Sequence, residues 1–212
     1  MEQTIGVIIP AFNEEKTIGR VLAAVLSWKK ADVVVVVSDG STDRTNEVVA
    51  RFGRRVRLIS FRTNRGKGAA LCAGVEKSLT DIILFLDADL VVLTPHDLDE
   101  LLAPILENTA DMTIGVHNFW GIGTFQPYNA LSGQRALRRR NIQRHLAVLR
   151  AARGGVEIFI NNLHKGLRVR SIVQPHVRTL RKIDKWPFFY AVWSYIKQAG
   201  EFGRAFLQTR AQ

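Results

Sequence analysis

The stretch DIILFLDADL, residues 81–90, runs an unbroken apolar segment directly into two carboxylates, Asp87 and Asp89. Short apolar runs that are rich in β-branched residues are typical of strands buried on both faces of a parallel sheet. Three earlier runs have the same character: TIGVII (4–9), VVVVV (33–37) and VRLIS (56–60). Helical patterns separate the four runs, so residues 1–90 predict a βαβαβαβ series within an α/β fold.

A polar stretch follows each predicted strand. The four stretches, in chain order, are PAFNEE, SDGSTD, TNRGKG and DAD. Connections of the βαβ kind bring the carboxyl ends of parallel strands to one edge of the sheet, and ligands bind beyond that edge. The sequence therefore predicts a ligand site where these stretches meet. For Asp87 and Asp89, the alternative is a pair of solvated carboxylates in a turn.

Three helices are predicted between these strands. The first follows Asn13, a residue type that suits the N-cap position, the second begins near Asp43, and the third begins near Gly66. Helical spacing identifies the side chains expected to face the core, which are Ile18, Val21, Leu22, Val25 and Leu26 in the first helix, Val48, Val49 and Phe52 in the second, and Leu71, Val75 and Leu79 in the third.

A second Asp-x-Asp pair, Asp97 and Asp99, follows Thr94-Pro95. Threonine suits the N-cap and proline the first helical position, so a fourth helix begins here. Acidic side chains in the first turn of a helix are favoured by the helix dipole. We therefore interpret this pair as structural.

Charge is distributed unevenly along the chain, whose formal net charge is +11. Residues 1–107 hold 13 Lys and Arg against 15 Asp and Glu, a balance of −2, whereas residues 108–212 hold 17 against 4, a balance of +13. A strongly basic second half indicates a polyanionic partner there, namely nucleic acid, an anionic membrane or a phosphorylated substrate.

The chain contains one cysteine, Cys72, which excludes an internal disulfide and favours a reducing, cytoplasmic environment. The first residues lack the basic start and long apolar stretch of a signal peptide. No apolar run approaches the roughly 18 residues that span a bilayer. We therefore expect a cytoplasmic chain that does not cross a membrane.

The four strand-end motifs, in this order and spacing, resemble the nucleotide-sugar-binding half of family 2 glycosyltransferases over residues 4–93. The resemblance implies the type A fold, a Rossmann-like nucleotide-diphospho-sugar transferase fold with a mixed, mainly parallel sheet and flanking helices. It also implies a hexosyltransferase with a nucleoside-diphosphate-sugar donor, a UDP-sugar by preference, a Mg²⁺ or Mn²⁺ ion, and inversion at the anomeric carbon.

The resemblance further implies roles for individual residues. Asp89 is expected to contact the metal directly, Asp87 to lie toward the ribose and the metal's water, and His176 to supply a third ligand. The residues expected to bind the donor are Pro10, Ala11, Phe12, Glu14, Asp39, Lys67, Asp87 and Ala88. Simpler alternatives remain open: Phe12 could be core packing, Lys67 a mobile surface lysine, and His176 a surface histidine.

The stretch LSGQRALRRR, residues 131–140, resembles a segment of polyprenyl-phosphate glycosyltransferases of the dolichyl-phosphate-mannose-synthase-like kind. By this resemblance Ser132, Arg135 and Arg138 meet the acceptor phosphate. The alternative is a basic amphipathic helix with Leu137, Ile142 and Leu146 inward.

Glu157 lies in a stretch that resembles the following family segment, a Gly-rich loop that opens a helix and then a strand, and it occupies the acidic position near the acceptor. It could act as a general base or orient an arginine. The residues expected to take part in catalysis are Asp89, Glu157 and Arg135.

These features predict a single catalytic domain over residues 1–180, with a nucleotide-sugar half at 1–93 and an acceptor half at 94–180. Residues 181–212 combine aromatic and basic side chains at helix-like spacing. Such a segment suits the interface of an anionic membrane. Packing against the catalytic domain or against a homodimer partner is the competing interpretation.

The function predicted from the sequence is a metal-dependent, inverting glycosyltransferase, peripherally bound at the inner face of the cell membrane, that uses a polyprenyl phosphate or another lipid acceptor. The alternative within enzymes is a small soluble phosphorylated acceptor such as phosphoglycerate. The alternative of another class is a non-catalytic basic module that binds nucleic acid or membrane. We expect no nucleic-acid partner, because a non-catalytic chain has no need to keep Asp87, Asp89, Lys67 and Asp39 together.

Overall fold

The computed structural model describes residues 3–116, 132–152 and 155–179. Its main sheet has seven strands in the order β3-β2-β1-β4-β7-β6-β8. The strands are β1 (Ile5–Ala11), β2 (Val33–Ser38), β3 (Arg57–Ser60), β4 (Ile82–Phe85), β6 (Met112–Val116), β7 (Arg135–Arg138) and β8 (Val169–Val173). A small ribbon pairs β5 (Leu90–Val91) with β9 (Arg178–Thr179).

The sheet is mixed and mainly parallel. The four predicted strands, β1 to β4, run parallel to one another, and β8 runs parallel to β6. Strand β7 lies between β4 and β6 and is antiparallel to both. The predicted architecture is therefore confirmed, and both predicted halves of the chain contribute to one continuous sheet.

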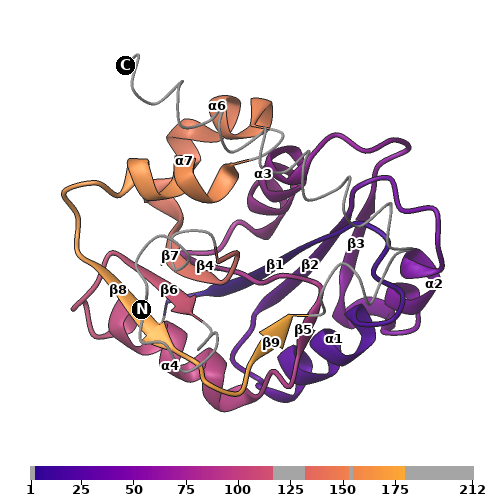
Figure 1. Cartoon of the computed structure of the whole chain (residues 1–212), viewed down its shortest axis with the longest axis horizontal. Coiled ribbons are helices and arrows are strands. Elements are labelled where there is room, and N and C mark those ends of the chain that lie inside the picture. Colours follow the sequence, from indigo (N-terminus) through magenta and orange to yellow (C-terminus); the bar gives the residue numbers. More distant parts are fainter. Residues whose placement is uncertain (1–2, 117–131, 153–154, 180–212) are drawn as a thin grey trace.

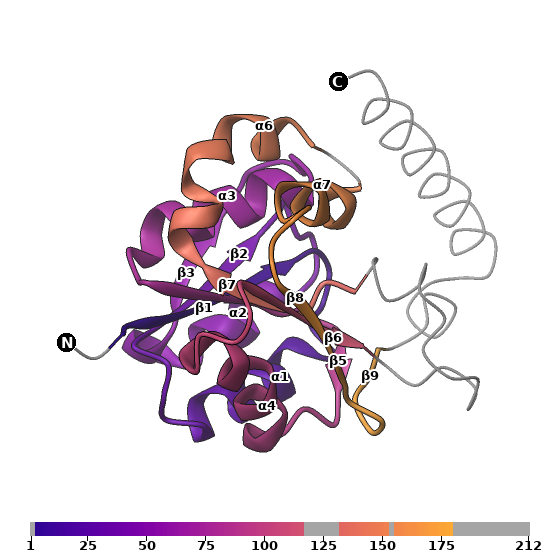
Figure 2. The ribbon, with the colours of Figure 1, turned by 90° about the vertical axis from the view of Figure 1, so that its left-hand side faces the viewer.

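Helices cover both faces of this sheet (Figures 1 and 2). One layer holds α1 (Ile18–Ser27), α2 (Thr45–Ala50) and α4 (Pro95–Leu106), and the other holds α3 (Lys67–Ser78), α6 (Leu146–Ala151) and α7 (Val156–Leu163). Short 3₁₀ turns occupy Gly53–Arg55, Arg139–Asn141 and Gln143–His145. Side chains alternate along β1, so Val7 and Ile9 pack beneath α1 while Ile8 packs beneath α3.

The second Asp-x-Asp pair is structural, as predicted. Asp97 and Thr94 form a capping box at the start of α4, in which Asp97 Oδ2 accepts a hydrogen bond from the Thr94 backbone N–H at 2.8 Å. Asp99 Oδ1 accepts from Trp28 Nε1 at 2.7 Å and pairs with Lys30 Nζ at 2.6 Å. This aspartate therefore ties α4 to the end of α1.

Two expectations about the helices are wrong. Asn13 does not cap α1, which begins at Ile18; it adopts the left-handed conformation, and its Oδ1 accepts a hydrogen bond from the Thr42 backbone N–H at 2.8 Å. Leu79 does not face the core but is 72% exposed, because the backbone turns left-handed there and ends α3. In both places a turn replaces the expected helical geometry.

The alternative of a basic amphipathic helix at residues 131–140 is also wrong. Residues 135–138 form strand β7, and all four of its side chains are buried. This segment forms a strand because β4 and β6, which are distant in the sequence, supply hydrogen-bond partners on both of its sides. Residues 156–163 and 169–173 form the predicted helix and strand.

No helix among the residues that the structure describes is long and apolar enough to cross a membrane. The predicted aromatic and basic segment, residues 181–212, lies outside the described residues.

Candidate active site

Asp87 and Asp89 follow β4 at the carboxyl edge of the sheet. Ala11 ends β1 and is paired with Ser38 at the end of β2, and the chain leaving β4 continues along β1 through the hydrogen bond from Leu86 N to Ile8 O at 3.1 Å. The loops after β1, β2 and β4 therefore leave the sheet at one edge, as the sequence predicts. Ala88, between the two aspartates, is buried in the core beside α1.

Lys67 bridges two carboxylates at this edge. Its Nζ lies 2.7 Å from Asp87 Oδ1 and 2.6 Å from Glu157 Oε1. Lys67 is the first residue of α3, and Glu157 lies in the first turn of α7, so both helices begin at the site. The structure thus joins three residues that the sequence assigns to it, and Lys67 is not a mobile surface lysine.

The charges of the site stabilise the ammonium form of Lys67. Burial would lower the pKa of this side chain, but the charges of Asp87 and Glu157 and its hydrogen bonds to both raise the pKa above its ordinary value. Lys67 therefore keeps its positive charge throughout the physiological pH range.

Gly133 packs directly against the Asp87 carboxylate. A Cβ atom added to Gly133 would lie 2.1 Å from Asp87 Oδ1 and 2.3 Å from Oδ2, which leaves no space for any side chain. Ser132, which precedes it, is half-buried, and its Oγ accepts a hydrogen bond from the Gln134 backbone N–H at 3.3 Å. Ser132 therefore lies next to a residue of the site, and its contact with an acceptor phosphate stays a prediction. Gly133 is a site residue that the sequence reasoning missed.

Arg135 lies on β7 opposite Phe85, next to the carboxyl end of β4. The residue is 1% exposed, and its Nη2 donates to Asn161 Oδ1 at 3.1 Å. Burial lowers the pKa of the guanidinium, while the negative charges of Glu157 and Asp87 oppose that change. The positive charge of Arg135 thus attracts the carboxylates of Glu157 and Asp87 from inside the protein. A buried position of this kind suits electrostatic support of the two carboxylates better than direct contact with an acceptor.

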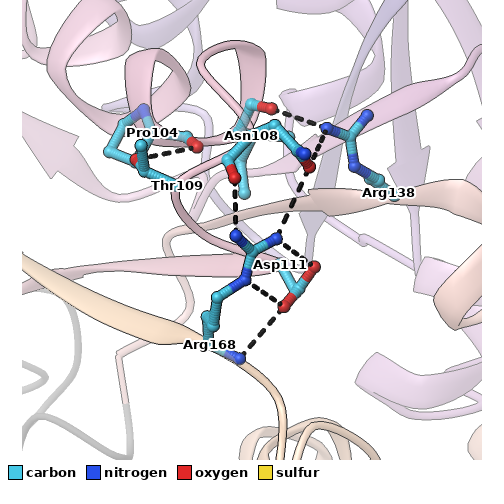
Figure 3. Close-up of polar contacts among 7 residues, drawn as sticks. Pro104, Asn108, Thr109, Asp111, Arg138 and Arg168 are labelled. Atoms are coloured by element: carbon cyan, nitrogen blue, oxygen red, sulfur yellow. Dashed lines mark hydrogen bonds and ion pairs between the residues drawn. The ribbon is translucent and has the colours of Figure 1, made fainter.

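Arg138 is not part of this site. It pairs with Ile82 at the opposite end of β4, and its Nη2 donates to the Ile105 backbone oxygen at 2.8 Å and to Asn108 Oδ1 at 3.3 Å. Figure 3 shows Arg138 and Arg168 converging on Asn108, just after the end of α4. The predicted acceptor role of Arg138 is therefore wrong, because β7 carries it to the far edge of the sheet.

Asp39 organises the loop after β3. Its carboxylate accepts the backbone N–H groups of Arg65 at 2.6 Å and Gly66 at 2.8 Å, and the residue is almost fully buried. Gly66 has a φ of +95°, a conformation that side-chain-bearing residues rarely adopt, and it immediately precedes α3. Asp39 therefore fixes the start of the helix that presents Lys67.

The loop after β1 holds the remaining predicted donor residues. Phe12 is 40% exposed, so it is not core packing. Pro10 and Ala11 complete β1, and Glu14 Oε2 accepts from the Thr17 hydroxyl at 2.9 Å. Their contacts with a donor stay predictions.

His176 does not join Asp87 and Asp89. Its Nε2 lies 2.9 Å from Asp97 Oδ1, and Asp97 is fully buried in the capping box of α4. Within residues 3–116, 132–152 and 155–179, no group of three or more His, Cys, Asp or Glu side chains is arranged to hold a metal ion. The predicted ligand role of His176 is therefore not borne out by the geometry.

Two carboxylates nevertheless fit a hard divalent cation. Carboxylate oxygens are the ligands that Mg²⁺ prefers, and it is commonly held by one or two carboxylates together with substrate phosphates and water. Asp87 already binds a cation here, the Lys67 ammonium. The donor set at the end of β4 therefore suits Mg²⁺ or Mn²⁺ with a diphosphate as co-ligand.

A hollow of about 540 Å³ lies between the loop after β3, α3 and α6. Its lining comes from the loop after β3, from α3 and from α6: Phe61, Thr63, Asn64, Arg65, Ala69, Ala73, Glu76 and Arg150. None of these residues belongs to the carboxylate cluster, so the hollow does not mark the candidate site.

Comparison with known proteins finds relatives that match about half of this chain. Over 119 residues the chain is 30% identical to dodecaprenyl-phosphate galacturonate synthase of Rhizobium johnstonii, covering 52% of this chain and 35% of the relative. It is 34% identical to glucosyl-3-phosphoglycerate synthase of Mycolicibacterium smegmatis, covering 54% of this chain and 39% of the relative. The chain spans less than half the length of these relatives.

A solved structure of glucosyl-3-phosphoglycerate synthase from Mycobacterium tuberculosis, in complex with Mn²⁺, UDP and phosphoglyceric acid, superposes with a TM-score of 0.71 at 23% identity, covering 84% of this chain and 71% of that one. Another structure of that enzyme holds Mg²⁺ and UDP. The likeness confirms the predicted fold. Because the model of the glycosyl transferase family 2 matches residues 6–161, from β1 into α7, this chain belongs to that family of enzymes.

Proposed function

We propose that this chain transfers a sugar from a UDP-sugar to a lipid-linked phosphate, such as a polyprenyl phosphate, with Mg²⁺ or Mn²⁺ and with inversion at the anomeric carbon. The observation that carries the proposal is the bridge of Lys67 between Asp87 and Glu157 at the carboxyl edge of the sheet. In this bridge Asp87 is the candidate metal ligand, Lys67 is the cation proposed to bind phosphate, and Glu157 is the acid expected near the acceptor.

The donor half of the site suits a diphosphate. The start of α3 offers backbone N–H groups and the positive end of the helix dipole, which favour a phosphate. Asp39 holds that start in place through Arg65 and Gly66. A divalent cation on Asp87 and Asp89 would neutralise the charge that develops on the departing diphosphate. The exposed ring of Phe12 offers an apolar surface for the base and ribose.

The acceptor half suits a group that is already negatively charged. A phosphate is ionised near neutral pH, so its oxygen needs no general base to attack the anomeric carbon. Glu157 is engaged with Lys67 at 2.6 Å, which supports an orienting role. Lipid phosphates are the acceptors that the name of the Rhizobium johnstonii relative indicates, and a similar acceptor is proposed for this chain.

Phosphoglycerate is the second candidate acceptor. It offers the same phosphate chemistry, and the relative from Mycolicibacterium smegmatis, at 34% identity, is named for it. The two candidates differ in one physical property, because only the lipid acceptor requires a membrane or detergent phase.

The test is a transfer assay with a panel of UDP-sugars and GDP-sugars, Mn²⁺ or Mg²⁺, and two acceptors: undecaprenyl phosphate in vesicles and 3-phosphoglycerate in solution. We expect metal-dependent product with the lipid. Asp89→Asn should abolish transfer, while Asp99→Asn, the matched change in the structural Asp-x-Asp pair, should retain it. Product with phosphoglycerate alone would favour the second candidate, and equal activity of the Asp89 variant and the parent would refute the site.

Location at the inner face of the cell membrane and self-association belong to the same proposal. The first is tested by sedimentation with vesicles that contain anionic lipid, at low and high salt, since attraction to such lipid is electrostatic. The second is tested by light scattering of the purified chain. Residues 181–212 are the proposed membrane contact, and deletion of them should reduce vesicle binding while leaving UDP binding intact.

A further inference from the structure

We infer that Lys67 and the divalent cation exchange at Asp87, so that nucleotide and metal bind this chain cooperatively and the metal alone binds weakly. The inference rests on the proposed function and deepens it. The ion pair between Lys67 and Asp87 must open before a metal ion can bind Asp87.

The first observation is that the carboxylate of Asp87 already has a counter-ion. Lys67 Nζ lies 2.7 Å from Asp87 Oδ1, the distance of a charge-assisted hydrogen bond. The side chains of both residues are largely shielded from solvent, so their attraction is screened less than that of a surface pair. A metal ion that approaches Asp87 therefore competes with an internal cation.

The second observation is that Asp87 has little room to turn away from Lys67. Gly133 lies so close to both carboxylate oxygens that even a methyl group there would overlap them. The buried guanidinium of Arg135 adds another fixed positive charge nearby, as its coupling to Asp87 and Glu157 indicates. Adding a divalent cation beside two monovalent cations is unfavourable unless one of them moves or more negative charge arrives.

Lys67 is the cation that is able to move. Arg135 is enclosed on β7 and bonded to Asn161, whereas Lys67 has a flexible four-carbon side chain, about one third exposed, at the start of α3. Glu157, at 2.6 Å, holds its ammonium independently of Asp87. Lys67 can therefore leave Asp87 without losing every anionic partner.

A nucleoside diphosphate supplies the negative charge that makes this exchange favourable. Its phosphates, bound at the start of α3, offer Lys67 a replacement for Asp87, and their oxygens complete the coordination of a cation that has few protein ligands. Nucleotide binding then frees Asp87 for the metal. By thermodynamic linkage, the metal must raise the affinity for nucleotide by the same factor.

The experiment measures the Mn²⁺ affinity of the purified full chain, from the electron paramagnetic resonance signal of free Mn²⁺, with and without UDP. For the parent we expect UDP to tighten Mn²⁺ binding about tenfold or more, within the usual range of coupling between sites. Lys67→Met removes the competing charge and keeps the length of the side chain. In this variant Mn²⁺ alone should bind about fivefold tighter than to the parent. The tightening by UDP should be about fivefold smaller than in the parent, because only the coordination by the diphosphate oxygens remains.

Two further variants serve as a control and as an alternative to Lys67→Met. Lys77→Met alters an exposed lysine of the same helix and should behave like the parent. Lys67→Gln is a second neutral variant for the case in which Lys67→Met fails to fold, and it should show the same gain in Mn²⁺ affinity. A merely structural role of Lys67 predicts the opposite, namely no gain or a loss in the affinity for Mn²⁺ alone.

The outcomes separate the inference from the function on which it rests. If the parent binds Mn²⁺ with UDP but the neutral Lys67 variants bind Mn²⁺ alone no tighter than the parent does, the exchange is refuted and the proposed function stands. If the parent binds neither Mn²⁺ nor UDP, the proposed function fails and the inference fails with it.

Discussion

The ammonium nitrogen of Lys67 lies 2.6 Å from a carboxylate oxygen of Glu157, although 90 positions separate the two residues along the chain. Lys67 begins α3, which the third strand-end motif leads into, and Glu157 lies in the first turn of α7 in the basic half. At the candidate site, this contact joins a residue of the predicted nucleotide-sugar half to a residue of the predicted acceptor half.

Glu157→Gln should lower the free energy of unfolding by about 1–2 kcal/mol, because it removes one anionic partner of a largely shielded lysine that keeps its charge. It should also lower kcat/KM for transfer, since Lys67 is then oriented by Asp87 alone. Urea denaturation and the transfer assay check the two effects. Glu76→Gln is the matched control: it breaks the exposed pair with Arg150 and should cost about 0–1 kcal/mol without changing transfer.

Gly133→Ala should impair the site more than the fold. The new methyl group overlaps both oxygens of Asp87, so the carboxylate must shift, at a cost of about 1–3 kcal/mol in stability. We expect metal-dependent UDP binding, measured by calorimetry, to weaken at least tenfold. Gly19→Ala, in the first turn of α1, is the control and should leave binding unchanged, because the nearest atom to its added Cβ is Val48 Cγ1 at 3.3 Å. Full binding by Gly133→Ala would show that Asp87 need not keep its position.

Asp39→Asn should loosen the loop before α3. One of its two acceptors for the Arg65 and Gly66 N–H groups becomes an amide donor, and a buried backbone N–H left without a partner costs about 1–3 kcal/mol. Hydrogen exchange at these two amides should accelerate, while exchange at the amides of β1 should change little. Unchanged protection at Arg65 and Gly66 would contradict the structural role assigned to Asp39.

Cys72 should be unreactive in the folded chain. Burial raises the pKa of its thiol from the ordinary value of 9.0 to about 11, and Glu76 adds to the effect while Arg150 opposes it. A disulfide reagent at pH 8 should therefore modify Cys72 only after denaturation, because the thiolate is the reactive form. Rapid modification of the native chain would contradict the buried position of this side chain in α3.

The same pKa fixes the sign of a pH effect on stability. Between about pH 9 and 11 the unfolded thiol loses its proton while the folded thiol keeps it, so the native state binds more protons and the free energy of unfolding falls as the pH rises. The contribution is about 2–3 kcal/mol across that window. The difference between the parent and Cys72→Ala isolates it from other groups that titrate there, and equal pH slopes would contradict it.

The grouping of polar residues at the carboxyl edge of the sheet could be predicted from the sequence, because it depends on local sequence patterns. Apolar runs such as residues 82–86 are recognisable in isolation, and parallel connections place their carboxyl ends together whatever the rest of the chain does. Asp39, Lys67 and Asp87 each follow a strand of this series, so their convergence follows from the topology.

Arg135 and Arg138 show why the rest could not be predicted. On a helix, residues three apart share a face, so both arginines would point to the same ligand. On a strand they face opposite sides and lie about 10 Å apart along the strand. Only the long-range pairing of β7 with β4 decides which arginine reaches the site, and no local pattern encodes it. The same register places Gly133 against Asp87, a contact for which the sequence holds no signal.

His176→Ala tests the correction to the metal site. Nε2 of His176 is hydrogen-bonded to Asp97 Oδ2 at 3.1 Å. The variant should therefore leave the Mn²⁺ affinity measured with UDP within about twofold of the parent and lower the free energy of unfolding by about 1–3 kcal/mol. Asp97→Asn should also lower the free energy of unfolding. The loss in the double variant should be smaller than the sum of the two single losses, because the two residues share one interaction. A loss of Mn²⁺ affinity of tenfold or more in His176→Ala would instead restore the ligand role, since it would mean that the histidine leaves Asp97 for the metal when the donor binds.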